Sequence, residues 1–200
     1  MRRRGGPAAA DDVAVIESSV REPERFAVLF DRHAPHIYRY LARRAGRQAA
    51  DDLVAETFLA AFARRDRYDL AHADARPWLY GIATNLVGQH RRDLARQYRI
   101  RQAAPAEAEV PGHADRVAAD VTAQSMRPLL DAALAALPAG DRDVLLLIAW
   151  EQLTYQEVSR ALGIPVGTVR SRLHRARTKV RQVLAGTGAG ATYEELTTNE

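Results

Sequence analysis

Residues 153–177, LTYQEVSRALGIPVGTVRSRLHRAR, predict two helices joined by a tight turn. Thr154 is suited to cap the start of the first helix, because Glu157 stands three residues later and can complete a capping box. Gly163 is expected to end this helix, since the left-handed conformation costs glycine less than other residues. The two residues after Gly163 then form the turn before the second helix.

The second helix, expected from about residue 166 to 181, has two unlike faces. Val169, Leu173 and Ala176 recur at helical spacing and form an apolar stripe. The other face carries the candidate DNA-contacting residues, which are Thr168, Arg170, Ser171, Arg172, His174, Arg175 and Arg177. Such a helix can lie in the major groove, where arginine bonds two acceptors of guanine and flanking arginines neutralise phosphates. Residues 154–184 hold seven basic side chains and one acid, which favours a DNA-binding helix-turn-helix over a solvated surface helix.

The composition limits what else the chain can be. Its 200 residues are 47% hydrophobic, which is typical of globular proteins that bury a core. The absence of cysteine excludes a disulfide framework, a cysteine-ligated zinc site and a thiolate nucleophile. No stretch has the length and apolar character of a signal peptide or a membrane span, so we expect a cytoplasmic protein with no membrane insertion.

Helical periodicity recurs along the chain, and no strand-like alternation of useful length accompanies it. Apolar residues over 24–41 recur every three or four positions, which predicts a first helix. A second helix is expected over 50–65, with acids at its start, where the helix dipole favours them. A third opens near Arg76 after a polar loop over 66–75. We therefore predict an all-α fold.

Changes in composition divide the chain into segments. We expect a flexible leader over 1–23, a helical domain over 24–101, an acidic linker over 102–126, a second helical domain over 127–185 and a mobile tail over 186–200. The predicted architecture is therefore two small helical domains joined by a flexible linker.

Several segments resemble one protein family. Residues 154–158, TYQEV, and 167–177, GTVRSRLHRAR, are similar to region 4 of the extracytoplasmic-function (ECF) group of bacterial sigma-70 factors. Residues 51–58, DDLVAETF, resemble the region 2 helix of that family, and residues 78–86, WLYGIATNL, resemble its segment at the −10 promoter element. The segments stand in the family's order, and the resemblance covers about residues 25–184.

The resemblance implies a promoter-specificity subunit that binds core RNA polymerase and promoter DNA and needs no cofactor or metal. Region 4 would read the −35 element through the basic helix face named above. Region 2 would bind the polymerase clamp through Asp51, Asp52, Glu56 and Phe58. It would open the −10 element with Arg76, Tyr80, Asn85, Arg91 and Arg92. An inhibitory partner, an anti-sigma factor, is a reasonable further hypothesis.

Five residues of region 2 leave alternatives open. Thr84 stands where the family usually has Arg, Gln89 where Asp is common and Ala55 where Gln is common. The preferred −10 sequence and part of the polymerase contact are therefore not decided by the resemblance. Phe58 and Trp78 each have the structural alternative of a place in the core.

A conventional helix-turn-helix transcription regulator is the alternative function. It would need a receiver or ligand domain, and a receiver would show alternating strands and helices that residues 26–101 do not show. An enzyme is not expected, because the six histidines are scattered and no carboxylate cluster completes a metal site. Neither a phosphate-binding glycine loop nor a nucleophile elbow is present.

Overall fold

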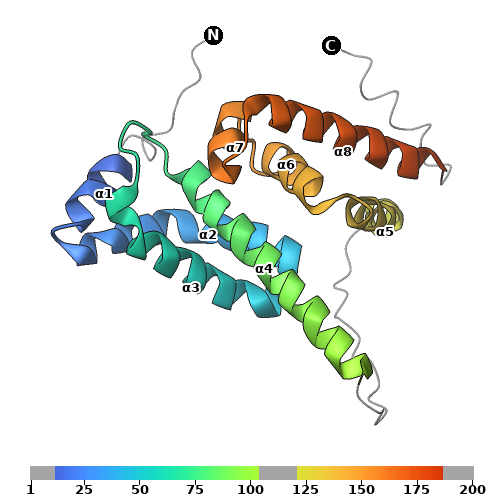
Figure 1. Ribbon diagram of the computed structural model, residues 1–200, viewed down its shortest axis with the longest axis horizontal. Helices are drawn as coiled ribbons and strands as arrows, with labels where there is room; N and C mark the ends of the chain where they lie inside the picture. The colour runs from blue at the N-terminus through green and yellow to red at the C-terminus, as the bar shows by residue number, and fades with distance from the viewer. Residues whose placement is uncertain (1–11, 104–120, 187–200) are drawn as a thin grey trace.

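The computed structural model describes residues 12–103 and 121–186, and within these ranges it contains only helices and their connections. The predicted all-α fold is therefore confirmed for the described part of the chain. Figure 1 shows the helices in two groups. We call residues 12–103 the N-terminal unit and residues 121–186 the C-terminal unit.

Three long helices form the body of the N-terminal unit, as the apolar periodicity predicts. They are α2 (Ala27–Ala45), α3 (Arg47–Ala63) and α4 (Arg76–Ala103). Shorter helical segments accompany them, namely α1 (Asp12–Ser19), η2 (Pro23–Phe26) and η3 (Arg65–Arg67). Their inward faces form the core with buried residues that include Leu29, Ile37, Leu41, Leu53, Ala61, Leu79 and Val87.

The C-terminal unit consists of four helices in the described ranges. These are α5 (Val121–Ala135), α6 (Ala139–Ala149), α7 (Tyr155–Leu162) and α8 (Val166–Gly186). The long helix α8 packs across the other three. Its apolar stripe is buried against them, so its opposite face is directed away from the core.

Part of the segment expected to be a flexible leader is helical, so that expectation is wrong for residues 12–19. Asp12 in α1 accepts hydrogen bonds from the backbone N–H of Ala75 at 3.1 Å and from Nε2 of His33 at 2.9 Å, and it pairs with Arg32. These partners lie 20 to 63 positions further along the chain. A local search for periodicity does not detect contacts of that range.

The segment expected as a linker, 102–126, is helical at both ends. Helix α4 continues to Ala103 and α5 begins at Val121, so the helical signal extends further than the composition indicates. Residues 104–120 lie outside the described residues. The same holds for residues 1–11 and for residues 187–200 of the expected mobile tail.

The two units pack against each other. Helix α7 lies against α4, α6 also contacts α4, and buried apolar residues of both units join in one continuous core. In Figure 1, α6 and α7 lie over the first half of α4, whereas its second half extends past the other helices. Within the ranges the model describes, no helix combines the length and the apolar character needed to cross a membrane.

Candidate nucleic-acid interface

Helices α7 and α8 have the helix-turn-helix geometry that the sequence predicts. Thr154 Oγ1 accepts from the backbone N–H of Glu157 at 3.3 Å, and the Glu157 carboxylate accepts from the backbone N–H of Thr154 at 2.6 Å. Gly163 ends α7 in the left-handed conformation, with φ 63° and ψ 34°. The N–H of Ile164 then donates to the carbonyl of Ser159 at 3.1 Å. The predicted capping box and glycine turn are therefore confirmed.

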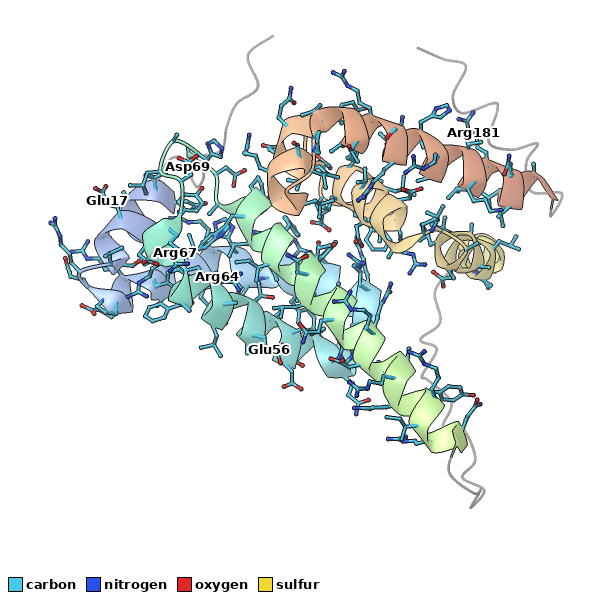
Figure 2. The ribbon with its side chains drawn as sticks, in the orientation of Figure 1. Glu17, Glu56, Arg64, Arg67, Asp69 and Arg181 are labelled. Carbon is cyan, nitrogen blue, oxygen red and sulfur yellow. The ribbon has the colours of Figure 1, made fainter. Side chains whose placement is uncertain are left out.

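The predicted apolar stripe of α8 faces inward. Val169 and Ala176 are fully buried, and Leu173 is 2% exposed. The outward face includes exposed Arg170, Ser171, His174 and Arg177, with half-buried Thr168 beside them. Figure 2 shows Arg181 on the outer edge of α8, further along this basic helix. The helix therefore presents a basic face on a rigidly packed support.

Two of the α8 arginines also contact α6. Nε and Nη2 of Arg175 donate to the two carboxylate oxygens of Asp141, at 3.0 and 2.9 Å. The Asp141 side chain is 7% exposed and that of Arg175 is 59% exposed. The Arg172 guanidinium lies over Gly140, with Nη1 2.6 Å from the position that a Cβ atom would take there. Arg175 and Arg172 therefore help to hold α8 on α6.

The five α4 residues expected at the −10 element do not share one open surface. Asn85 and Arg92 are exposed, Arg76 and Arg91 are half-buried, and Tyr80 is fully buried. Only part of this predicted site is therefore open to DNA in the structure.

Tyr80 belongs to a chain of hydrogen bonds that runs from the N-terminal to the C-terminal unit. His33 Nδ1 lies 2.9 Å from His36 Nε2, and His36 Nδ1 lies 3.1 Å from the Tyr80 hydroxyl. The Tyr80 hydroxyl donates to the carboxylate of Glu151, between α6 and α7. Burial and the Glu151 carboxylate raise the pKa of Tyr80, so the hydroxyl keeps its proton. Burial, with the charges of His33 and Arg76, lowers the pKa of His36 to about 4.

The acids predicted to bind polymerase lie on the open face of α3. Asp51, Asp52 and Glu56 are exposed, and Figure 2 shows Glu56 pointing away from the helix bundle. Asp52 and Glu56 line a groove of about 270 Å³ together with Asp93 and His90 of α4. This face therefore offers several carboxylates to a partner.

Phe58 lies in the core, which contradicts its predicted role as a residue that touches a partner. It is 5% exposed, and its ring packs edge-on against Phe30 with the centroids 4.9 Å apart. The next residue, Leu59, is 68% exposed and is the apolar side chain on the acidic face of α3. Trp78 is half-buried, and the centroid of its ring lies 5.0 Å from that of the Tyr68 ring.

Sequence reasoning missed the residues that join the two units. Arg44 donates from Nη2 to the carboxylate of Asp143 at 2.5 Å, and the Arg43 guanidinium lies 5.2 Å from the centroid of the Trp150 ring. The Glu151 carboxylate accepts a hydrogen bond from the Tyr80 hydroxyl. The hydrogen-bonded partners stand 71 to 99 positions apart, so no local pattern could have paired them.

Two family models match the chain. The model described as Sigma-70 region 2 matches residues 29–97, and the model described as Sigma-70, region 4 matches residues 127–180. The first match covers most of α2, all of α3 and most of α4, and the second runs from α5 into α8. Together the matches include the acidic face of α3 and the basic face of α8.

Curated relatives are also named as RNA polymerase sigma factors. The ECF RNA polymerase sigma factor SigE of Mycolicibacterium smegmatis is 37% identical over 169 residues, which are 78% of this chain and 60% of that protein. The RNA polymerase sigma factor CarQ of Myxococcus xanthus is 33% identical over 162 residues, which are 80% of this chain and 90% of that protein. The chain thus spans less than two thirds of the first relative and nearly all of the second.

Solved structures share the fold. The sigma factor RpoE, in complex with the anti-sigma factor NepR from Bartonella quintana, matches 76% of this chain and 91% of its own, with TM-score 0.55 and 23% identity. CnrH, in complex with the cytosolic domain of CnrY, matches 89% of this chain and 98% of its own, with TM-score 0.61 and 24% identity. With both regional models and the curated relatives in agreement, the chain belongs to the ECF group of the sigma-70 family.

Proposed function

We propose that the chain binds core RNA polymerase, directs it to promoters through their −10 and −35 elements and thereby starts transcription. It acts as a specificity subunit and not as an enzyme. The observation that carries the proposal is the basic face of α8, presented outward by a capped helix-turn-helix. The relatives named as RNA polymerase sigma factors support it. The proposal includes a cytoplasmic location, where polymerase and chromosomal DNA meet.

For the −35 element, we propose that α8 enters the major groove with its N-terminal half. Thr168, Arg170, Ser171 and His174 would approach base edges, since the first residues of such a helix lie deepest in the groove. Arg177 would neutralise a phosphate. Arg172 and Arg175 would contribute to DNA binding mainly by holding α8 in place.

For polymerase binding, we propose the exposed face of α3. Asp51, Asp52 and Glu56 would pair with basic side chains of the polymerase, and Leu59 would supply the apolar contact. Leu59 thus takes the role that the sequence suggested for Phe58. A surface that combines carboxylates with an exposed leucine suits a partner helix with basic and apolar groups.

For the −10 element, we propose Arg76, Tyr80, Asn85, Arg91 and Arg92 of α4, of which Asn85 and Arg92 are exposed in the structure. Arginine and aromatic side chains can hold an unstacked base and the adjacent backbone. An anti-sigma factor is also part of the proposal, because RpoE and CnrH were both solved with protein partners.

The experiment that tests the function is transcription with purified components. The chain is mixed with core RNA polymerase, and promoters are taken from genes whose transcripts rise when the chain is overproduced. We expect the chain to copurify with core polymerase and to direct runoff transcription. DNA binding and activation that do not depend on this chain's contact with polymerase would favour a conventional regulator.

The polymerase contact is tested with charge reversals. Asp52→Lys combined with Glu56→Lys should abolish copurification, because the groove between α3 and α4 loses its acidic character. Glu17→Lys combined with Glu24→Lys, at two exposed positions of the N-terminal unit, is the matched control, because it reverses the same number of charges. Equal copurification of the double variant and the control would place the polymerase contact elsewhere.

A further inference from the structure

Helix α1 is hydrogen-bonded to both ends of the connection between α3 and α4. Asp12, where α1 begins, accepts from the backbone N–H of Ala75 at 3.1 Å, directly before α4. At the other end of α1, the carbonyl of Ser19 accepts from Nε of Arg65 at 3.1 Å, shortly after the end of α3. Figure 1 shows α1 beside this connection. The helix therefore spans the connection and holds it at two points.

The connection also has hydrogen bonds of its own. The Tyr68 hydroxyl donates to the carbonyl of His72 at 2.5 Å and lies 3.2 Å from the carbonyl oxygen of Asp74. Burial, with the negative charges of Asp12 and Asp74, raises the pKa of Tyr68 to about 12, so the hydroxyl keeps its proton. The Asp74 carboxylate accepts from the backbone N–H of Arg76 at 2.8 Å. The connection is thus ordered up to the first residue of α4.

Asp12 is a buried carboxylate with several partners. Its side chain is 0% exposed, and besides Ala75 it contacts Nε2 of His33 at 2.9 Å and pairs with Arg32. Burial by itself would raise the pKa of Asp12, but the bonds from these three residues outweigh it and lower the pKa. A buried carboxylate is costly unless its charge is paired and its oxygens accept hydrogen bonds. Asp12 meets both conditions, so its position is closely defined.

A second route leads from Asp12 to Tyr80. His33 Nδ1 lies 2.9 Å from His36 Nε2, and His36 Nδ1 lies 3.1 Å from the Tyr80 hydroxyl. With the bond between Asp12 and His33, these contacts form a line from α1 through α2 to α4. Asp12 therefore fixes the start of α4 twice, through the backbone of Ala75 and through the side chain of Tyr80.

Both routes end at candidate residues for the −10 element. Arg76 directly follows Ala75, and Tyr80 stands about one helical turn later. A binding site works only when supporting contacts hold its side chains to within about half an ångström. Helix α1 precedes residues 29–97, which the region 2 model matches, so the model does not include this support.

We propose that Asp12 is a positioning residue for binding of the −10 element, because from α1 it fixes the start of α4 and with it Arg76 and Tyr80. Asp12 itself does not touch DNA, since its side chain is fully buried. The effect on DNA binding rests on the proposed function, whereas the effect on the start of α4 does not.

Hydrogen–deuterium exchange on the full chain tests whether Asp12 fixes the start of α4. Asp12→Ala should speed amide exchange over residues 69–76 about tenfold or more, because the N–H of Ala75 loses a buried acceptor. Exchange in α8 should stay the same. Glu17→Ala, which removes an exposed carboxylate from the same helix, is the control.

A milder variant guards against a general folding defect in Asp12→Ala. Asp12→Asn keeps an oxygen that can accept from the N–H of Ala75 but loses the charge that pairs with Arg32. It should speed exchange over residues 69–76 about threefold, with an unchanged circular dichroism spectrum. If neither Asp12 variant exchanges faster there than Glu17→Ala, Asp12 does not fix the start of α4.

Binding by the holoenzyme tests the positioning role. Complexes of the chain with core RNA polymerase are titrated with two DNAs, a fork whose −10 strand is unpaired and a duplex that carries only the −35 element. We expect Asp12→Ala to weaken binding of the fork about tenfold and to leave binding of the duplex unchanged, and Asp12→Asn should recover part of the loss.

The other outcomes separate the positioning role from the proposed function. Fork binding equal to that of Glu17→Ala, or an equal loss on both DNAs, would overturn the positioning role of Asp12. If the unchanged holoenzyme does not distinguish the fork from a fork with an altered −10 sequence, the −10 assignment in the proposed function is wrong. Amide exchange then still decides whether Asp12 fixes the start of α4.

Discussion

The outer face of α8 and the first half of α4 both carry residues proposed to bind DNA, yet these residues differ in how exposed they are. On α8, Arg170 and Arg177 are exposed and directed away from the core. On α4, Tyr80 is fully buried, and Arg76 is bonded to the other unit. One face is exposed in the structure, and part of the other is covered by the C-terminal unit.

The difference comes from the range of the contacts. The face of α8 is set by its own apolar stripe and by the turn at Gly163, all within neighbouring residues. The burial of Tyr80 in α4 depends on a contact with Glu151, which stands 71 positions later in the chain. Helix faces can thus be assigned from periodicity, whereas their accessibility depends on how distant elements pack.

The largest expected effect comes from the open face. Arg170→Ala combined with Arg177→Ala should weaken binding to a −35 duplex at least roughly thirtyfold, since two well-placed arginine contacts contribute about 2 kcal/mol or more. Fluorescence anisotropy measures the affinity, and Arg21→Ala combined with Arg67→Ala, at two exposed positions of the N-terminal unit, is the control that removes the same two charges. A loss equal to that of the control would mean that α8 is not the DNA-reading helix.

An intermediate effect is expected at Arg175. This residue lies on α8, but its side chain is hydrogen-bonded to another helix, through Asp141 of α6. Arg175→Ala leaves the nearly buried Asp141 carboxylate without its cation and should lower Tm by several degrees. Arg170→Ala should leave Tm unchanged, because Arg170 is exposed on the outer face. If the two variants unfold at the same temperature, the Asp141 pair has no structural role.

The smallest effect is a pH dependence of stability at the covered face. The pKa of His36 is about 4 in the folded chain, against 6.5 for an ordinary histidine. Between these values the unfolded chain takes up a proton that the folded chain does not. The contribution of His36 to the free energy of unfolding is therefore fully present above about pH 6.5 and is lost as the pH falls towards about 4.

Urea unfolding at about pH 7.5 and about pH 5 measures this dependence. His36→Gln should reduce the loss of stability on acidification, whereas His174→Gln, at an exposed position on α8, should not. An unchanged pH dependence in His36→Gln would contradict the burial of a neutral imidazole beside Tyr80.

Several features of the fold follow from short stretches of sequence. Thr154 and Glu157 are three residues apart, and the capping box they form is the predicted one. The α3 helix was predicted too, but its periodicity left Phe58 with two possible roles. Only the edge-on packing against Phe30 decides that Phe58 is core and that Leu59 is the exposed neighbour.

The sequence by itself determined the all-helical fold, the helix-turn-helix and the basic face of α8, because these depend on residues within about one or two helical turns of each other. The tertiary structure alone decided that Asp12 is anchored in a helix, that Arg175 is paired with Asp141, and that Tyr80 is covered at Glu151. Each of these depends on partners brought together by packing over 20 to 71 positions of chain. The spacing of residues along the sequence does not indicate such long-range pairs.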